Sequence, residues 1–205
     1  MRTPYIEAFK NRGEEVVVLD IFPGSDFAKK MKEAGLRNQP IDMFKYAISH
    51  LECNLKAPVL TDKKCYSTID KVVIIAHGHQ NHLQFCSEDE ADNPFVFSED
   101  IYFLSGISRI KVLDIQACEC GKPCNYSYYD YFDEYTCIAY EFAKKEQIEC
   151  VYAWTDKCKF LFKYNFSISG GIYEKIYMVN NQVIHKTVKA NEYFEWIPLY
   201  RPLEY

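Results

Sequence analysis

Short, unbroken apolar runs recur along this chain and alternate with segments in which apolar residues are spaced three or four apart. Continuous apolar sequence is typical of strands in a parallel sheet that is covered on both faces. The runs therefore predict the strands of a mainly parallel sheet. They lie within Glu14–Phe22, Val72–Ala76, Ile110–Ala117 and Glu149–Trp154.

The segments between these runs predict helices. A helix that runs to about Leu36 has Ser25 or Asp26 as its cap and Gly35 near its end. Further helices are expected from Pro40 to Cys53 or Leu55, over Ser98–Leu104 and over Tyr131–Lys145. Strands and helices thus alternate, which predicts an α/β fold with three layers, a central sheet between two layers of helices.

The C-terminal quarter has β-type composition without helical spacing. Strands are expected within Lys159–Ser167, Ile172–Val179 and Val183–Val188, and Asn180 and Asn181 form the expected hairpin turn. These strands predict antiparallel additions to the sheet or a small separate sheet. The chain is expected to form one domain over residues 1–205, with a core at about 14–158 and a β-rich extension at about 159–205.

Composition narrows the class of protein. The net charge of the 205 residues is −5 and the sequence pI is about 5.6, which gives no electrostatic basis for binding nucleic acid or an anionic membrane. Residues 1–7 contain no apolar run, so no signal peptide is expected, and no run is long enough to span a membrane. The 9 cysteines show no disulfide framework, which predicts reduced thiols and a cytoplasmic protein.

Two of the predicted strands end in residues that can do chemistry. His77 and Gly78 follow Val72–Ala76, and Cys118 ends the run that begins at Ile110. Ligands of open α/β sheets bind at the carboxyl ends of the strands, so His77 and Cys118 are expected at one edge. A thiolate is a nucleophile, and an imidazole beside it can lower the thiol pKa or protonate a leaving amine.

The two motifs resemble those of the caspase-like cysteine peptidases of clan CD. The resemblance rests on His77-Gly78 after one apolar strand and Gln116-Ala117-Cys118 after the next. Glu119 and Cys120 follow the cysteine here, and glycine comes later, at Gly121. Ala117-Cys118-Glu119-Cys120-Gly121 is more similar to the bacterial CHAT branch, whose cysteine motif reads roughly A-C-E-[ST]-G.

The resemblance implies a flavodoxin-like caspase fold and a cysteine endopeptidase that needs no cofactor. Cys118 would be the nucleophile and His77 the general acid/base, and the backbone amides of Gly78 and Cys118 would form the oxyanion hole. The partner would be a protein or peptide substrate, with a regulatory protein as a further possible partner. Asp156 or Asp20, each following a predicted strand, could select a basic side chain, and Glu119 is a further candidate for substrate contact.

Three alternatives remain open at this point. His77, His79 and His82 fit the H-x-H-x-x-H pattern of a zinc-dependent hydrolase. Cys118, Cys120 and Cys124 could hold a structural zinc, or an oxidised pair of them could switch the site off. The chain could also be a catalytically silent caspase-like interaction domain that binds a partner through the tyrosine-rich segment 126–132.

Overall fold

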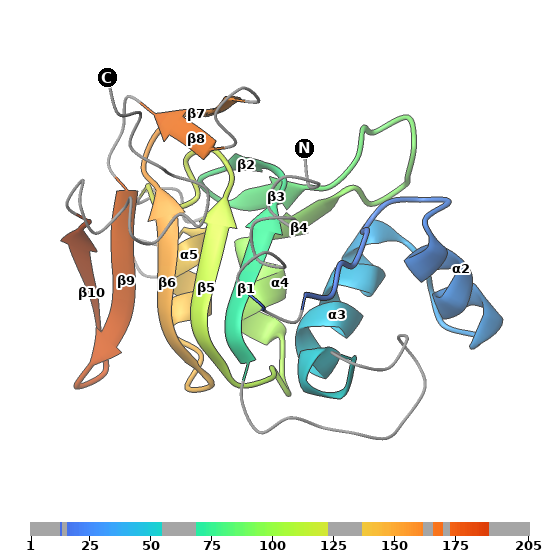
Figure 1. Cartoon of the computed structure of the whole chain (residues 1–205), viewed down its shortest axis with the longest axis horizontal. Coiled ribbons are helices and arrows are strands. Elements are labelled where there is room, and N and C mark those ends of the chain that lie inside the picture. The colour runs from blue at the N-terminus through green and yellow to red at the C-terminus, as the bar shows by residue number, and fades with distance from the viewer. Residues whose placement is uncertain are drawn as a thin grey trace.

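A mixed five-stranded sheet forms the centre of the protein. The computed structural model describes residues 13, 16–54, 69–122, 137–161, 166–169 and 173–188. The strand order is β1-β5-β6-β9-β10, in which β1, β5 and β6 are parallel and β9 and β10 are antiparallel to their neighbours (Figure 1). The α/β class is confirmed, although the sheet is mixed rather than mainly parallel. The strands are β1 (Ile69–Ile75), β5 (Ile110–Gln116), β6 (Ile148–Trp154), β9 (Tyr173–Val179) and β10 (Gln182–Thr187).

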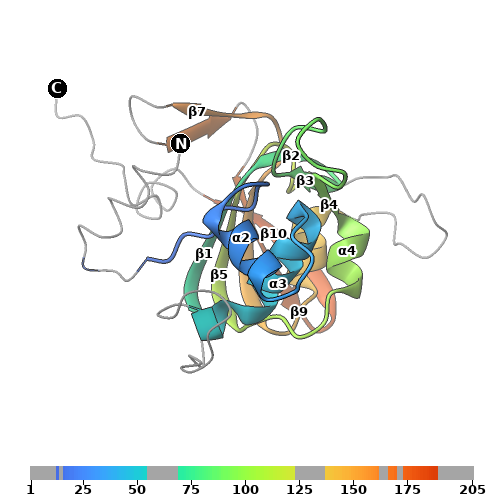
Figure 2. The same ribbon diagram turned by 90° about the vertical axis from the view of Figure 1, so that its right-hand side faces the viewer.

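The described helices lie on one side of this sheet. They are α2 (Asp26–Glu33), α3 (Pro40–Asn54), α4 (Ser98–Phe103) and α5 (Ile138–Ala143). Figure 1 shows α4 and α5 behind the sheet and α3 beside its β1 edge, and Figure 2 shows α3 and α4 on the same side of β1 and β5. The apolar side chains of α3, α4 and α5 share one core with Leu113 and Ile115 of β5. Helix α2 packs on α3 through a second cluster that contains Phe27 and Met31. The described residues thus form two layers, and the third layer of the caspase-like fold stays a prediction.

The prediction of a strand within Glu14–Phe22 is wrong. Residues 16–21 have no regular secondary structure, and Val17 and Val18 are 39% and 41% exposed. Leu19 and Ile21 instead pack beside α2 and α3. An extended apolar segment becomes a strand only when it finds a pairing partner, and this segment uses its apolar side chains to pack on helices.

Two small antiparallel sheets complete the described fold. One contains β2 (His77–His79), β3 (His82–Gln84) and β4 (Phe95–Phe97), and it stands above the carboxyl ends of β1 and β5 (Figure 1). The other contains β7 (Cys158–Leu161) and β8 (Phe166–Ser169). The strands expected within Ile172–Val179 and Val183–Val188 correspond to β9 and β10 at the edge of the main sheet. In place of the single strand expected within Lys159–Ser167 there are two, β7 and β8, which pair in a separate sheet.

The start of one described helix, α2, follows from a capping side chain that the sequence predicts. Of the two expected caps of α2, Ser25 is the one observed, since its Oγ accepts a 3.0 Å hydrogen bond from Ala28 N. Helix α4 begins one residue earlier than the expected cap allows, because Phe97 is its N-cap and Phe97 N donates to Asp100 Oδ2. Helix α5 is described only from Ile138, and residues 131–136 of the expected helix lie outside the described residues. Within the described chain, no helix has the length and apolar character that a membrane crossing requires.

Candidate active site

Gly78 is the point at which the chain after β1 meets the chain after β5. A Cβ atom built on Gly78 would lie 2.7 Å from three atoms, namely Ala117 Cβ, the Cys118 carbonyl oxygen and Cys120 Sγ. Non-bonded heavy atoms do not approach so closely, so glycine is required for this contact. His77 precedes Gly78 and Cys118 follows Ala117, so the contact places His77 and Cys118 at the same edge of the sheet. His77 is exposed and Cys118 is partly buried.

Strand β2 presents its two histidines and its glycine to opposite sides. Because side chains alternate along a strand, His77 and His79 share one face, whereas the Cα hydrogens of Gly78 occupy the face that meets residues 117–120. His79 pairs with His82 across the two-residue turn, so these two residues form a hydrogen-bonded pair. Gly78 belongs to the next pair, which is not hydrogen-bonded, and its N–H therefore points away from β3.

The backbone after Cys118 is fixed against β6 and α5. Glu119 N donates a 3.0 Å hydrogen bond to the Asp156 carbonyl, and Gly121 N donates one of 2.8 Å to the Trp154 carbonyl. The Cys120 carbonyl accepts from Ala139 N at 3.2 Å. Glu119 adopts a left-handed backbone with φ = 55°, which costs about 1–3 kcal/mol for a residue other than glycine. The surrounding hydrogen bonds hold this conformation.

The Glu119 carboxylate lies between the side chains of His79 and Lys122. His79 Nε2 is 3.6 Å from Glu119 Oε2, and Lys122 Nζ is 3.8 Å from Glu119 Oε1. The Glu119 side chain is 14% exposed, whereas His79 and Lys122 are 54% and 46% exposed. Glu119 is therefore committed to neighbours within the protein, which weakens the expectation that it contacts substrate.

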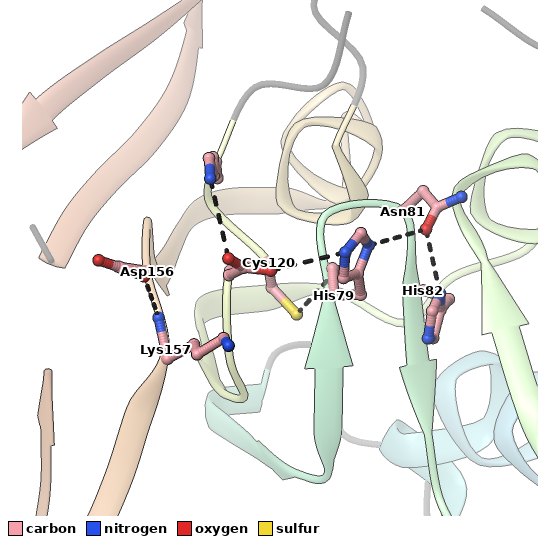
Figure 3. Close-up of polar contacts among 8 residues, drawn as sticks. His79, Asn81, His82, Cys120, Asp156 and Lys157 are labelled. Carbon is pink, nitrogen blue, oxygen red and sulfur yellow. Dashed lines mark hydrogen bonds and ion pairs between the residues drawn. The ribbon is translucent and has the colours of Figure 1, made fainter. Parts of the chain in front are cut away.

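Asn81 joins the two other histidines of the β2–β3 hairpin. Its Oδ1 lies 3.4 Å from His79 Nδ1 and 3.0 Å from His82 Nδ1, and the two rings stack with their centroids 5.5 Å apart (Figure 3). Partial burial, together with the neighbouring His79, holds the pKa of His82 below its ordinary value. Across the part of the chain that the structure describes, no three His, Cys, Asp or Glu side chains are arranged to hold a metal ion. The three-histidine zinc alternative therefore gains no support from the geometry.

Cys120 anchors the segment after the candidate nucleophile. Its side chain is fully buried, and its Sγ donates a long hydrogen bond, 3.6 Å, to the His79 carbonyl (Figure 3). Five described cysteines are not in disulfide bonds: Cys86, Cys118, Cys120, Cys137 and Cys150. Cys124 of the cysteine alternative and the tyrosine-rich segment 126–132 lie outside the described residues.

The two acids expected to select substrate have different positions. Asp156 is exposed just past the end of β6, on the edge that carries Cys118, and its Oδ1 accepts a 2.7 Å hydrogen bond from Lys157 N (Figure 3). Asp20 belongs to the segment that is not a strand. Asp20 therefore does not follow a strand that leads to this edge, and Asp156 is the better placed of the two.

Sequence reasoning missed a buried polar network below the site. Asp114 on β5 is 2% exposed and accepts 2.6 Å hydrogen bonds from Gln116 Nε2 and Tyr173 Oη. Trp154 Nε1 donates to Gln116 Oε1 at 3.5 Å. Burial raises the pKa of Asp114 to about 6, although Lys71 and the two hydrogen bonds oppose this shift. A carboxylate in the middle of an apolar run was the signal in the sequence.

The resemblance to caspase-like peptidases rests on the residues described above. No family model matches this chain, and neither the curated proteins nor the solved structures contain a match to it.

Proposed function

We propose that this protein is a cysteine endopeptidase with Cys118 as nucleophile and His77 as general acid/base. The observation that carries the proposal is the contact of Gly78 with the Cys118 backbone, because it joins the residue after His77 directly to the nucleophile candidate. The caspase-like order of histidine and cysteine along the chain, after two strands that are parallel neighbours, supports the same assignment. The reaction would take place in a bacterial cytoplasm.

The proposed reaction has two steps. The Cys118 thiolate attacks the carbonyl carbon of the scissile peptide bond, an S–C bond forms, and the amine leaves with a proton from His77. Water then attacks the thioester, His77 accepts a proton from it, and the acid product leaves Cys118 as the thiolate. No cofactor takes part.

The N–H of Gly78 is the proposed donor to the oxyanion. The β2–β3 pairing directs it away from β3, and the absence of a side chain lets the backbone lie against Cys118. Donors fixed in advance at the place where charge develops contribute a large part of acyl-transfer catalysis. The Cys118 N–H is the second proposed donor.

For the substrate we propose a protein or peptide with a basic side chain before the cleaved bond. Asp156 is the acid that carries this assignment, because it is exposed on the same edge as Cys118. The Glu119 carboxylate already faces His79 and Lys122, which makes it the weaker candidate.

A fluorogenic peptide library tests the function directly. Cys118→Ala and His77→Ala are each expected to abolish cleavage, since general acid–base and nucleophilic groups contribute roughly 10²-fold or more. Cys86→Ala is the matched thiol control, because Cys86 is also partly buried. His82→Gln, measured with and without a chelator, separates the dyad from a zinc hydrolase.

Three results would contradict the proposal. Equal cleavage by wild type and Cys118→Ala would remove the nucleophile. Loss of cleavage on chelation, together with loss in His82→Gln, would favour the zinc hydrolase. Silence of the wild type against every peptide, with a Cys118 thiol whose reactivity does not depend on His77, would favour the interaction domain.

A further inference from the structure

The segment that carries Cys118 is held on its two sides by different kinds of contact. On the β6 and α5 side, the contacts are backbone hydrogen bonds from Glu119 N and Gly121 N and to the Cys120 carbonyl. On the β2 side, side chains make polar contacts: the Glu119 carboxylate with His79 Nε2, and Cys120 Sγ with the His79 carbonyl. The β2 side is the side that carries His77.

His79 is oriented for this contact. Its Nδ1 faces Asn81 Oδ1 and its Nε2 faces Glu119 Oε2, so both ring nitrogens meet oxygen atoms (Figure 3). The ring is also stacked on His82, which limits its rotation. A carboxylate with little exposure and an oriented imidazole form a defined contact between the two segments.

The backbone conformation of Glu119 is the second unusual feature of this residue. Its φ of 55° sets the direction in which the chain continues immediately after Cys118. An unusual backbone conformation next to a reactive group is typical of sites in which geometry is enforced by the surroundings. The contact with His79 is one of the forces that maintain it.

We propose that Glu119 is a positioning residue. Through its contact with His79 it holds the Cys118 segment against β2 and so fixes the position of Cys118 relative to His77. This inference rests on the proposed dyad. Glu119 does not touch substrate in this assignment, which replaces its expected role in substrate contact. His79 is the second positioning residue.

The pH dependence of Cys118 alkylation by iodoacetamide tests the proposal without any peptide substrate. A nearby imidazolium lowers the apparent pKa of a thiol. If Cys118 moves away from His77 in Glu119→Gln, the pH at which alkylation reaches half its maximal rate, here called the alkylation midpoint, is expected to rise. Removal of a negative charge near the thiol has the opposite direct effect and would lower the midpoint. The sign of the shift therefore separates positioning from simple electrostatics.

Two further variants and one control sharpen this test. His79→Gln should reproduce the shift of Glu119→Gln, and the double variant should add nothing further, because both changes remove one contact. Glu119→Asn, which tolerates the left-handed backbone, serves if Glu119→Gln does not fold. Lys122→Gln removes one charge beside Glu119 and keeps the contact with His79, so the shift it produces measures the direct effect of a single charge.

Where a cleaved peptide is known, kcat should fall roughly 10- to 100-fold in Glu119→Gln with little change in KM.

The outcomes distinguish this inference from the proposed function. A raised midpoint in both single variants, without additivity, supports the positioning role. A lowered or unchanged midpoint, or additive effects, overturns it while leaving the dyad intact, provided that His77→Ala still shifts the midpoint. An alkylation profile that His77→Ala does not alter overturns the dyad and the positioning role together.

Discussion

Tyr173 donates a 2.6 Å hydrogen bond to Asp114 across the strand that lies between them. Tyr173 is on β9 and Asp114 on β5, and both side chains are buried. The same hydroxyl group accepts a 3.2 Å hydrogen bond from Gln116 Nε2. One phenol oxygen therefore ties an antiparallel strand of the sheet to its parallel part.

Removal of this hydroxyl group is expected to destabilise the fold. Tyr173→Phe leaves a buried carboxyl group and a buried amide each without one partner, which costs about 1–3 kcal/mol of unfolding free energy. Tyr177→Phe is the matched control on the same strand, since Tyr177 is less buried, and should change the unfolding free energy by less than about 0.5 kcal/mol. Urea denaturation measures both. Equal effects of the two substitutions would show that the Asp114 contact is not important for stability.

Asp114 gives the unfolding free energy a defined pH dependence. Burial raises its folded-state pKa from 3.8 to about 6, so the proton stabilises the folded state. That stabilisation is complete below the unfolded value and is lost as pH rises through the folded value, a change of about 3 kcal/mol between pH 4 and 6.

Asp114→Asn isolates this effect. The difference in unfolding free energy between wild type and Asp114→Asn should decrease from pH 4 to pH 6 and stay constant above about pH 7, because other groups cancel in the difference. Chemical denaturation at a series of pH values measures it. Parallel curves for the two proteins would mean that Asp114 titrates normally in the folded state.

Gly78 should tolerate no side chain. In Gly78→Ala, the new Cβ would meet the Cys118 backbone oxygen, which cannot move without displacing the segment after β5. We expect a loss of about 1–3 kcal/mol in unfolding free energy and a strong decrease of Cys118 reactivity toward iodoacetamide.

Gly106→Ala is the control for the Gly78 experiment. Gly106 has φ = 68° and no atoms within 4 Å of a built Cβ, so alanine there introduces backbone strain alone. It should lower the melting temperature and leave Cys118 reactivity unchanged. If Gly78→Ala behaves in the same way as Gly106→Ala, the close approach of Gly78 to Cys118 is not needed at the site.

Apolar runs predicted strands correctly only where the run hydrogen-bonds to neighbouring strands of the sheet. The apolar run around Leu113 and Ile115 is buried in the sheet core, as its sequence indicates. Val17 and Val18 have the same local character and are exposed, because the choice between strand and coil depends on a pairing partner that a local pattern does not contain.

For the candidate site, the sequence predicted only which residues follow the ends of neighbouring strands. The order of His77 and Cys118 follows from two apolar runs that become parallel neighbours. The left-handed backbone of Glu119 and its contact with His79 depend on hydrogen bonds from β6 and on the β2–β3 hairpin. Such tertiary contacts leave no periodic signal in the sequence, so Glu119 could be nominated but its role could not be derived.

The turn between β9 and β10 offers a last test of how backbone conformation selects sequence. Asn180 and Asn181 have φ values of 49° and 63°, the left-handed pair that a two-residue hairpin turn requires. Asn181→Val places a β-branched residue in this region and should lower the unfolding free energy by about 1–2 kcal/mol, whereas Asn181→Gly should not. Gln182→Val, on the adjacent exposed strand position, should be tolerated because its backbone is extended. Thermal denaturation followed by circular dichroism compares the three, and a stable Asn181→Val would show that the turn can adopt another conformation.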